Sequence, residues 1–258
     1  MMNTLSLLLA HLLPSLAAAL GLALLLGALR RALKPALEEG AQALVGISVA
    51  FVSMIFAFIL GFTLVNLWGN YAAAESVVQE EANEVRAIYR VAGFMPGGER
   101  LHALLKDYAG SIAKDEWPAM RRGEASPESD RLKNEVWRET LSLVSKGRGS
   151  AVMSSEVLDC LVRMNHARRK RLSMTESALH PLLLLALAVT GTSTFIGLLL
   201  VGVKNRRVQF LVDTLVALCI ALNVNLLLSL DRPFSGTGFT VSNDAFSTLA
   251  DRMNADAP

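Results

Sequence analysis

Few side chains in this 258-residue sequence have the types and spacing that catalysis requires. The four histidines are scattered along the chain: His11, His102, His166 and His180. None of them lies three or four residues from a second ligand in a metal-binding pattern. Cys160 and Cys219 form no Cys-x-x-Cys pair, and neither Gly-x-Ser-x-Gly nor His-Glu-x-x-His occurs. We therefore predict no catalytic residues, no metal or cofactor site and no enzymatic activity.

Polar residues inside long apolar segments carry more information, because burying them in lipid is costly. Asp213 interrupts such a segment shortly after Arg206 and Arg207, and Asn223 and Asn225 follow it. Asp213 could reach the membrane interface and pair with one of these arginines, or it could belong to an ion path. The two asparagines lie about 160° apart on a helical wheel. They therefore predict two different protein-facing or water-facing environments.

The apolar segment from Ala43 to Trp68 has two contrasting faces when it is placed on a helix. One face is a stripe of small residues, which we expect to pack against another helix: Gly46, Ala50, Ser53, Ala57 and Gly61. The opposite face is bulky and apolar with a polar residue near each end: Ser48, Phe51, Ile55, Phe58, Ile59, Phe62 and Asn66. It fits either a lipid-facing or intersubunit surface, or a hydrophobic pore constriction that gates by dewetting.

The composition explains which elements must position these residues. The chain is 52% hydrophobic and 19% charged, which excludes a disordered protein and indicates a polytopic membrane protein. A spanning helix needs about 20 mostly apolar residues. The sequence predicts four such spans in the lipid bilayer, over about residues 5–29, 43–68, 181–203 and 208–230. The net charge of +2 argues against a nucleic-acid partner.

We predict an all-α fold with a helical extramembrane domain, residues 69–180, between two transmembrane hairpins, 1–68 and 181–232, and a C-terminal tail, 233–258. Four amphipathic helices are expected in this domain, enough to close a bundle. The second span continues as the first of them, and Asp130 is expected to cap the third. We expect the many charges of this domain to form a solvated face, and Asp115 and Glu116 to serve helix-end chemistry.

Basic residues in short loops predict the orientation, because long domains do not carry the positive-inside signal. Two short loops on one side of the membrane hold these residues: Arg30, Arg31, Lys34, Lys204, Arg206 and Arg207. This side is predicted to face the cytoplasm of a bacterium, which places both termini and the central domain in the periplasm or outside. The basic run at residues 168–171 would favour the opposite orientation.

Several segments resemble a known family. The fourth predicted span ends with Asp231 and Arg232 at the water boundary, followed by a proline, as expected for a helix exit. The segments that carry the resemblance are Leu60–Thr63, Trp68–Tyr71, Glu81–Ala82, Tyr89–Arg90, Glu116–Met120 and Leu230–Gly236. Together they are similar to the bestrophin-like domain family of uncharacterised, mainly bacterial four-pass membrane proteins.

The resemblance has implications for function. It implies kinship with bestrophins, which are pentameric anion channels with four spans, a pore lined by the second span and a cytoplasmic helical domain. The expected function is therefore a homo-oligomeric channel for small inorganic ions, with anions marginally favoured and the second span lining a hydrophobic neck. The alternative is a non-conducting membrane scaffold or sensor that acts through the extramembrane bundle.

Overall fold

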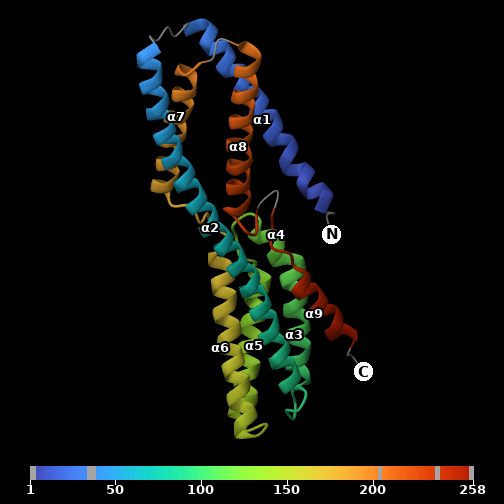
Figure 1. Ribbon diagram of the computed structural model, residues 1–258. Helices are drawn as coiled ribbons and strands as arrows, with labels where there is room; N and C mark the ends of the chain where they lie inside the picture. The colour runs from blue at the N-terminus through green and yellow to red at the C-terminus, as the bar shows by residue number, and fades with distance from the viewer. Residues whose placement is uncertain (1–3, 34–38, 203–204, 236–238, 256–258) are drawn as a thin grey trace. The chain divides into compact units, whose positions relative to one another are not determined.

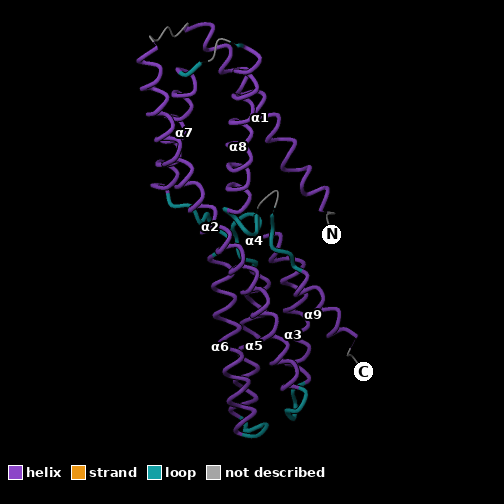
Figure 2. Tube along the Cα trace, viewed as in Figure 1, coloured by secondary structure: helices purple, strands orange, loops and turns teal. Residues whose placement is uncertain are grey.

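The computed structural model describes residues 4–33, 39–202, 205–235 and 239–255. All regular elements within these ranges are helical, which confirms the all-α prediction (Figure 2). They are α1 (Thr4–Leu33), α2 (Glu39–Ala92), α3 (Glu99–Ser111), a π-helical turn (Ile112–Glu116), α4 (Trp117–Met120), α5 (Pro127–Ser145), α6 (Ala151–Ser173), α7 (Pro181–Leu200), α8 (Arg206–Leu230) and α9 (Asp244–Ala255). Lys34 and Lys204 of the predicted short loops and Gly236 of the predicted helix exit lie outside the described residues.

The chain divides into two compact units. The membrane unit comprises Met1–Gly69 and Ala178–Asp231, and the helical unit comprises Asn70–Ser177 and Arg232–Pro258. In the part of the chain that the structure describes, four helices are long and apolar enough to cross a membrane, namely α1, the first part of α2, α7 and α8. The C-terminal residues, expected to form a separate tail, instead belong to the helical unit.

In the membrane unit, α1 and α8 pack closely, and α7 lies beside the first half of α2 (Figure 1). The contact face of α1 carries Ser15, Ala19 and Ala23, which are buried, and such small residues allow helix backbones to approach each other. Between α2 and α7, Phe56 packs over Gly191 and Val49 packs over Gly197. Glycines on α7 therefore make room for large side chains of α2.

The small-residue stripe of α2 does not form this contact and has no helix packed on it within the described part of the chain. A Cβ added at Gly46 or Gly61 would meet no other atom within 4 Å. The buried residues of the span lie instead on an intermediate face: Phe56, Leu60, Thr63 and Leu67. The reason is that bulky α2 side chains fit the glycines of α7, so the small residues are not needed for packing within one chain.

The helical unit has a closed apolar core, built by the last part of α2 together with α3, α5, α6 and α9. Tyr108, Leu161 and Met164 are fully buried in it. Helix α9 contributes Phe246, Leu249 and Met253, which are spaced three and four residues apart and are also buried. The 3.6-residue period of an amphipathic helix thus explains why the C-terminal segment packs on this unit.

Serine side chains begin the two helices that follow surface loops in this unit. Ser126 accepts a hydrogen bond from the backbone N–H of Ser129 and caps α5, while Ser150 accepts from Met153 and caps α6. The prediction that Asp130 caps the third helix was wrong. Pro127 is favourable at the first helical position, so the helix starts one residue after Ser126.

Candidate functional site

The predicted pore-lining residues of α2 share a face that the rest of the chain leaves largely open. Phe58 is 75% exposed, and Phe51 and Phe62 are also more than half exposed. Ile55, Ser48 and Asn66 are exposed and Ile59 is partly buried. The Ser48 hydroxyl donates to the Leu44 carbonyl of its own helix at 3.0 Å. This face therefore makes little contact within one subunit, whereas the intermediate face of the same helix, around Val49 and Phe56, packs on α7.

Asp213 is 2% exposed and pairs with Arg30 of α1. The Gln209 amide also donates to its carboxylate at 2.9 Å. Arg30 further donates to the carbonyl oxygens of Leu198, Leu199 and Val201 at the end of α7. Carbonyls in the last turn of a helix lack partners within the helix, so Arg30 both neutralises Asp213 and completes the α7 terminus. The partner is thus Arg30, which belongs to the neighbouring α1, and neither Arg206 nor Arg207.

The two asparagines of α8 have different surroundings. Asn225 donates to the Ser15 hydroxyl of α1 at 3.3 Å. Asn223 donates to the Cys219 carbonyl of its own helix at 2.8 Å. Their opposite placement on α8 separates them, and it makes Asn225 a link between two spans.

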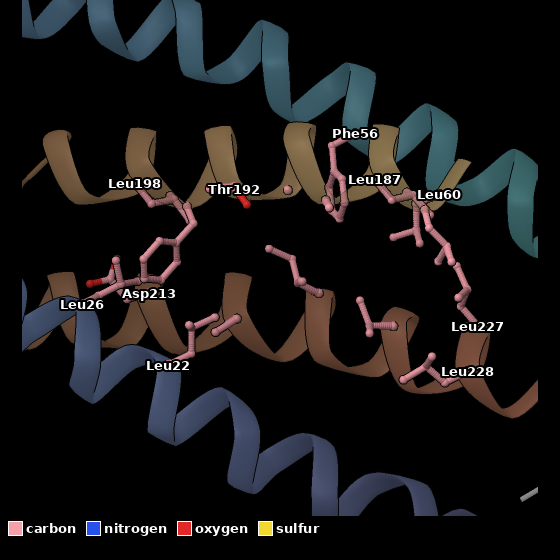
Figure 3. A pocket seen from close by; sticks show the side chains of 17 residues that line it. Leu22, Leu26, Phe56, Leu60, Leu187, Thr192, Leu198, Asp213, Leu227 and Leu228 are labelled. Atoms are coloured by element: carbon pink, nitrogen blue, oxygen red, sulfur yellow. The ribbon is translucent and has the colours of Figure 1, made fainter. Parts of the chain in front are cut away.

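An apolar pocket of about 370 Å³ lies among α1, α2, α7 and α8 of the membrane unit. Figure 3 shows Phe56 of α2 pointing into it, with Asp213 near one end and Leu228 near the other. Its remaining walls are almost entirely aliphatic. A pocket of this chemistry can hold an apolar chain, but it has no convergent polar groups that would orient a substrate.

A cluster of buried charges lies at the centre of the helical unit, where we had expected a solvated face. Arg171 is fully buried and binds Glu81 at 2.7 Å and Glu116 at 2.7 Å. Arg168 binds Glu116 at 2.5 Å and Asp130 at 2.7 Å. The expectation of a solvated face was wrong for these residues, because residues of α6 spaced three apart turn toward the core instead of toward water.

Aromatic side chains complete the surroundings of Arg171. Its guanidinium lies 5.6 Å from the ring centroid of Trp117 and 5.7 Å from that of Phe246. Trp117 in turn meets Phe234 edge to face, with the centroids 5.7 Å apart. The rings exclude water and favour a cation over their faces, so the ion pairs operate in a dry environment.

The cluster changes the protonation properties of its members. Burial raises the pKa of the Tyr108 phenol well above its usual value, and the nearby Glu81 carboxylate raises it further. The Tyr108 hydroxyl donates to Glu81 at 2.8 Å. Burial lowers the pKa of Arg171, but Glu81 and Glu116 outweigh this effect and raise it overall. The cluster therefore holds a neutral phenol and a charged guanidinium.

A π-helical turn places Glu116 in the cluster. Residues Ile112–Glu116 form this turn between α3 and α4, and the Trp117 N–H donates to the Ile112 carbonyl, five residues back. The Ala113 carbonyl in the same turn accepts a bond from the Asn243 amide at 3.4 Å. Such turns are frequent at functional sites. The local pattern around Glu116 does not predict these pairs, because Arg168 and Arg171 lie 52 and 55 positions away in the sequence.

The helix-exit motif is divided between the two units. Asp231 follows the last residue of α8, and its carboxylate accepts from the backbone N–H of Leu179 at 3.0 Å. Arg232 is exposed in the helical unit, and Phe234, two residues on, reaches Trp117. Segments that carried the resemblance, around Glu81, Glu116 and Phe234, thus meet in one core.

No group of three or more His, Cys, Asp or Glu side chains suited to a metal ion occurs among the described residues. Burial raises the pKa of the Cys160 thiol to about 12, with help from the neighbouring Glu84, so this cysteine is a poor nucleophile. The geometry defines a helical membrane protein with an open second-span face and a buried ionic core.

A bestrophin-like domain matches residues 15–246, and the chain belongs to the bestrophin-like family. Members of this family are typically channels rather than enzymes. No curated protein matches the chain.

Solved structures of a bacterial bestrophin homolog from Klebsiella pneumoniae share the fold. One variant is 14% identical with a TM-score of 0.67, covering 95% of this chain and 98% of that chain. A second variant is 15% identical with a TM-score of 0.66, covering 96% and 98%. A third structure of the homolog is 15% identical with a TM-score of 0.54, covering 97% and 100%.

Proposed function

We propose that the chain forms a homo-oligomeric ion channel in which α2 of each subunit lines a hydrophobic neck. The observation that carries this proposal is the open bulky face of α2 around Phe58, on a helix that is packed within its subunit through another face. Four spans are too few to enclose a wide pathway alone. Conduction therefore requires several subunits around an axis.

The unpacked small-residue stripe supports an assembly of this kind. Gly46 and Gly61 have open space at their Cβ positions, so a helix of a neighbouring subunit can approach α2 closely there. The bulky face lies roughly opposite this stripe on the helix. In a ring of α2 helices, the buried face of each helix can thus pack within its own subunit, the small-residue stripe can pack on the neighbouring subunit and the phenylalanines can line the neck.

Single-channel recording of purified protein in planar bilayers tests the neck. We expect Phe58→Ala and Phe62→Ala to raise conductance or to hold the channel open, because a wider and less apolar constriction stays wet. Leu185→Ala is the matched control, since Leu185 is 60% exposed on α7 and has no place in an α2-lined pore. Equal effects of Phe58→Ala and Leu185→Ala would contradict a neck lined by α2. The absence of any current would favour a non-conducting scaffold or sensor.

Anion selectivity is the finer part of the proposal. It rests on the family and on exposed basic residues of the helical unit, such as Arg169 and Lys170. Arg168 and Arg171 do not contribute, since carboxylates neutralise them. Reversal potentials in asymmetric potassium chloride distinguish a current carried by chloride from one carried by potassium. A shift toward the potassium equilibrium potential contradicts the anion proposal.

We further propose that the helical unit and both termini face the periplasm or the exterior. The short-loop arginines support this orientation, and the competing basic run is weakened because Arg168 and Arg171 are paired internally. A cysteine at exposed Glu124, in a background with Cys160 and Cys219 changed to alanine, tests it with a membrane-impermeant thiol reagent. Labelling of right-side-out vesicles is expected, and labelling only after permeabilisation refutes the orientation.

A further inference from the structure

A second pocket of the membrane unit, with a volume of about 480 Å³, lies between the end of α1 and the beginning of α8. Its apolar part is lined by Ala23, Gly27 and Phe210, which belong to the spans. Arg31 and Arg206 line it close to the span ends. The pocket is thus apolar toward the middle of the two spans and basic toward their ends.

The charges of this pocket do not cancel. Among the described residues that line it, Asp213 is the one acidic residue, and Arg30 already neutralises it. Arg30 also donates to the carbonyls that end α7, so its donors are largely occupied. Arg31 and Arg206 are exposed and form no ion pair with any described residue. Two guanidinium groups therefore remain for an anion.

We propose that this pocket binds the phosphate headgroup of an anionic phospholipid, with Arg31 and Arg206 as its ligands. Arginine matches phosphate oxygens with two parallel hydrogen bonds, and basic pockets between spans bind acidic headgroups. The Arg30–Asp213 pair forms a neutral, rigid wall behind the headgroup. This site is independent of whether the protein conducts ions.

The apolar wall favours a lipid over free phosphate as the source of the anion. Gly27 leaves open space on its side of the pocket, and Phe210 is 43% exposed. An acyl chain covers this apolar surface, whereas a hydrated phosphate ion gains nothing from it. Long arginine side chains at span ends reach naturally to the headgroup level.

Native mass spectrometry of the full chain in detergent, titrated with phosphatidylglycerol, tests the proposal. Replacing both arginines, in the Arg31→Gln Arg206→Gln variant, is expected to weaken binding at least about tenfold, because charge-assisted hydrogen bonds are lost. Arg207→Gln is the matched control, since Arg207 has the same charge and exposure next to Arg206 but does not line the pocket. It is expected to bind like the wild type, and phosphatidylcholine is expected to bind weakly.

A second variant leaves the charges unchanged. Gly27→Leu fills the apolar part of the pocket and is expected to weaken binding of phosphatidylglycerol, with helical circular dichroism as the check on folding. Equal losses in Arg207→Gln and in the double variant indicate general electrostatic attraction and overturn the site. Displacement of the lipid by millimolar inorganic phosphate overturns the lipid as its ligand.

Discussion

Arg30 in the membrane unit and Arg171 in the helical unit are both withdrawn from solvent, but they are neutralised in different ways. Arg30 has one carboxylate and several carbonyl oxygens from the end of α7. Arg171 has two carboxylates, from α2 and from the π-helical turn, and two aromatic faces. If the Asp213 carboxylate is removed, Arg30 keeps its acceptors at the end of α7. Around Arg171, the loss of one carboxylate or ring also disturbs the remaining groups.

The difference shows what each charge contributes to the fold. Arg30 of α1 binds α7 through backbone carbonyls, whose positions are fixed by the helix itself, and binds α8 through the Asp213 side chain. Arg171 joins segments that are distant in sequence. It does so through side chains, and all of their ion pairs form in one arrangement only. Buried ion pairs add little stability relative to apolar packing, but breaking one leaves an uncompensated charge. The two arginines therefore predict different responses to mutation.

The largest effect is expected for Arg171→Met. It leaves Glu81 and Glu116 buried without their shared cation, and such a loss costs about 3–5 kcal/mol. Chemical denaturation of the purified chain, followed by tryptophan fluorescence, measures the change. Arg169→Met is the control, since Arg169 is exposed two residues away. A cost no greater than that of the control would show that the cluster does not act as a unit.

A smaller effect is expected at Arg30 and Asp213. The single variants Arg30→Gln and Asp213→Asn and their combination form a double-mutant cycle, with an expected coupling of about 2 kcal/mol. Asp213→Asn is expected to be the milder single change, because Arg30 keeps its carbonyl partners on α7. Purely additive losses in thermal stability would contradict a direct pair.

Alkaline pH is expected to affect the helical unit through Tyr108. Its pKa is raised in the folded state, so the protonated phenol contributes stability that is present below the ordinary value of 10.0 and lost as pH rises above it. Tyr108→Phe removes this ionisation and is expected to flatten the stability profile above that pH. Absorbance of tyrosinate in the wild type should show one of the three tyrosines titrating only upon unfolding.

The smallest effects are expected at the two serine caps, and we expect them to differ between the two. Ser126→Ala and Ser150→Ala each remove one cap, at a cost of about 1 kcal/mol. Ser126 is buried and Ser150 is exposed, so water can replace the lost bond only at Ser150. We expect the larger loss of thermal stability for Ser126→Ala, and the reverse order would contradict this reasoning.

The sequence predicted the apolar spans better than the ionic core. Twenty-residue apolar runs have few alternatives to a spanning helix, so α7 and α8 were expected within a few residues. Arg171 and Glu81 lie 90 positions apart, and nothing in their local pattern distinguishes them from surface charges. The sequence marks Asp213 as unusual within its span. It does not identify Arg30 as the partner, because that pairing depends on which helices pack together.

The α2 face illustrates a second limit. Periodicity separated small from bulky residues correctly, but which face packs within the subunit was decided by the glycines of α7. Surface complementarity between two helices is not contained in the pattern of either one alone. The Phe58 experiment therefore tests the proposed pore assignment.

The π-helical turn at Ile112–Glu116 has an evolutionary consequence. A π-helical turn contains one residue more than an α-helical turn, so deleting one residue here would restore the regular register. A deletion here would rotate Glu116 by about 100° relative to α3 and turn its carboxylate away from Arg171. We therefore expect a relative with a one-residue gap at this point to lack the Glu116 charge in its core. Such a relative is expected to have replaced Arg171 as well, or to keep Arg171 without this partner.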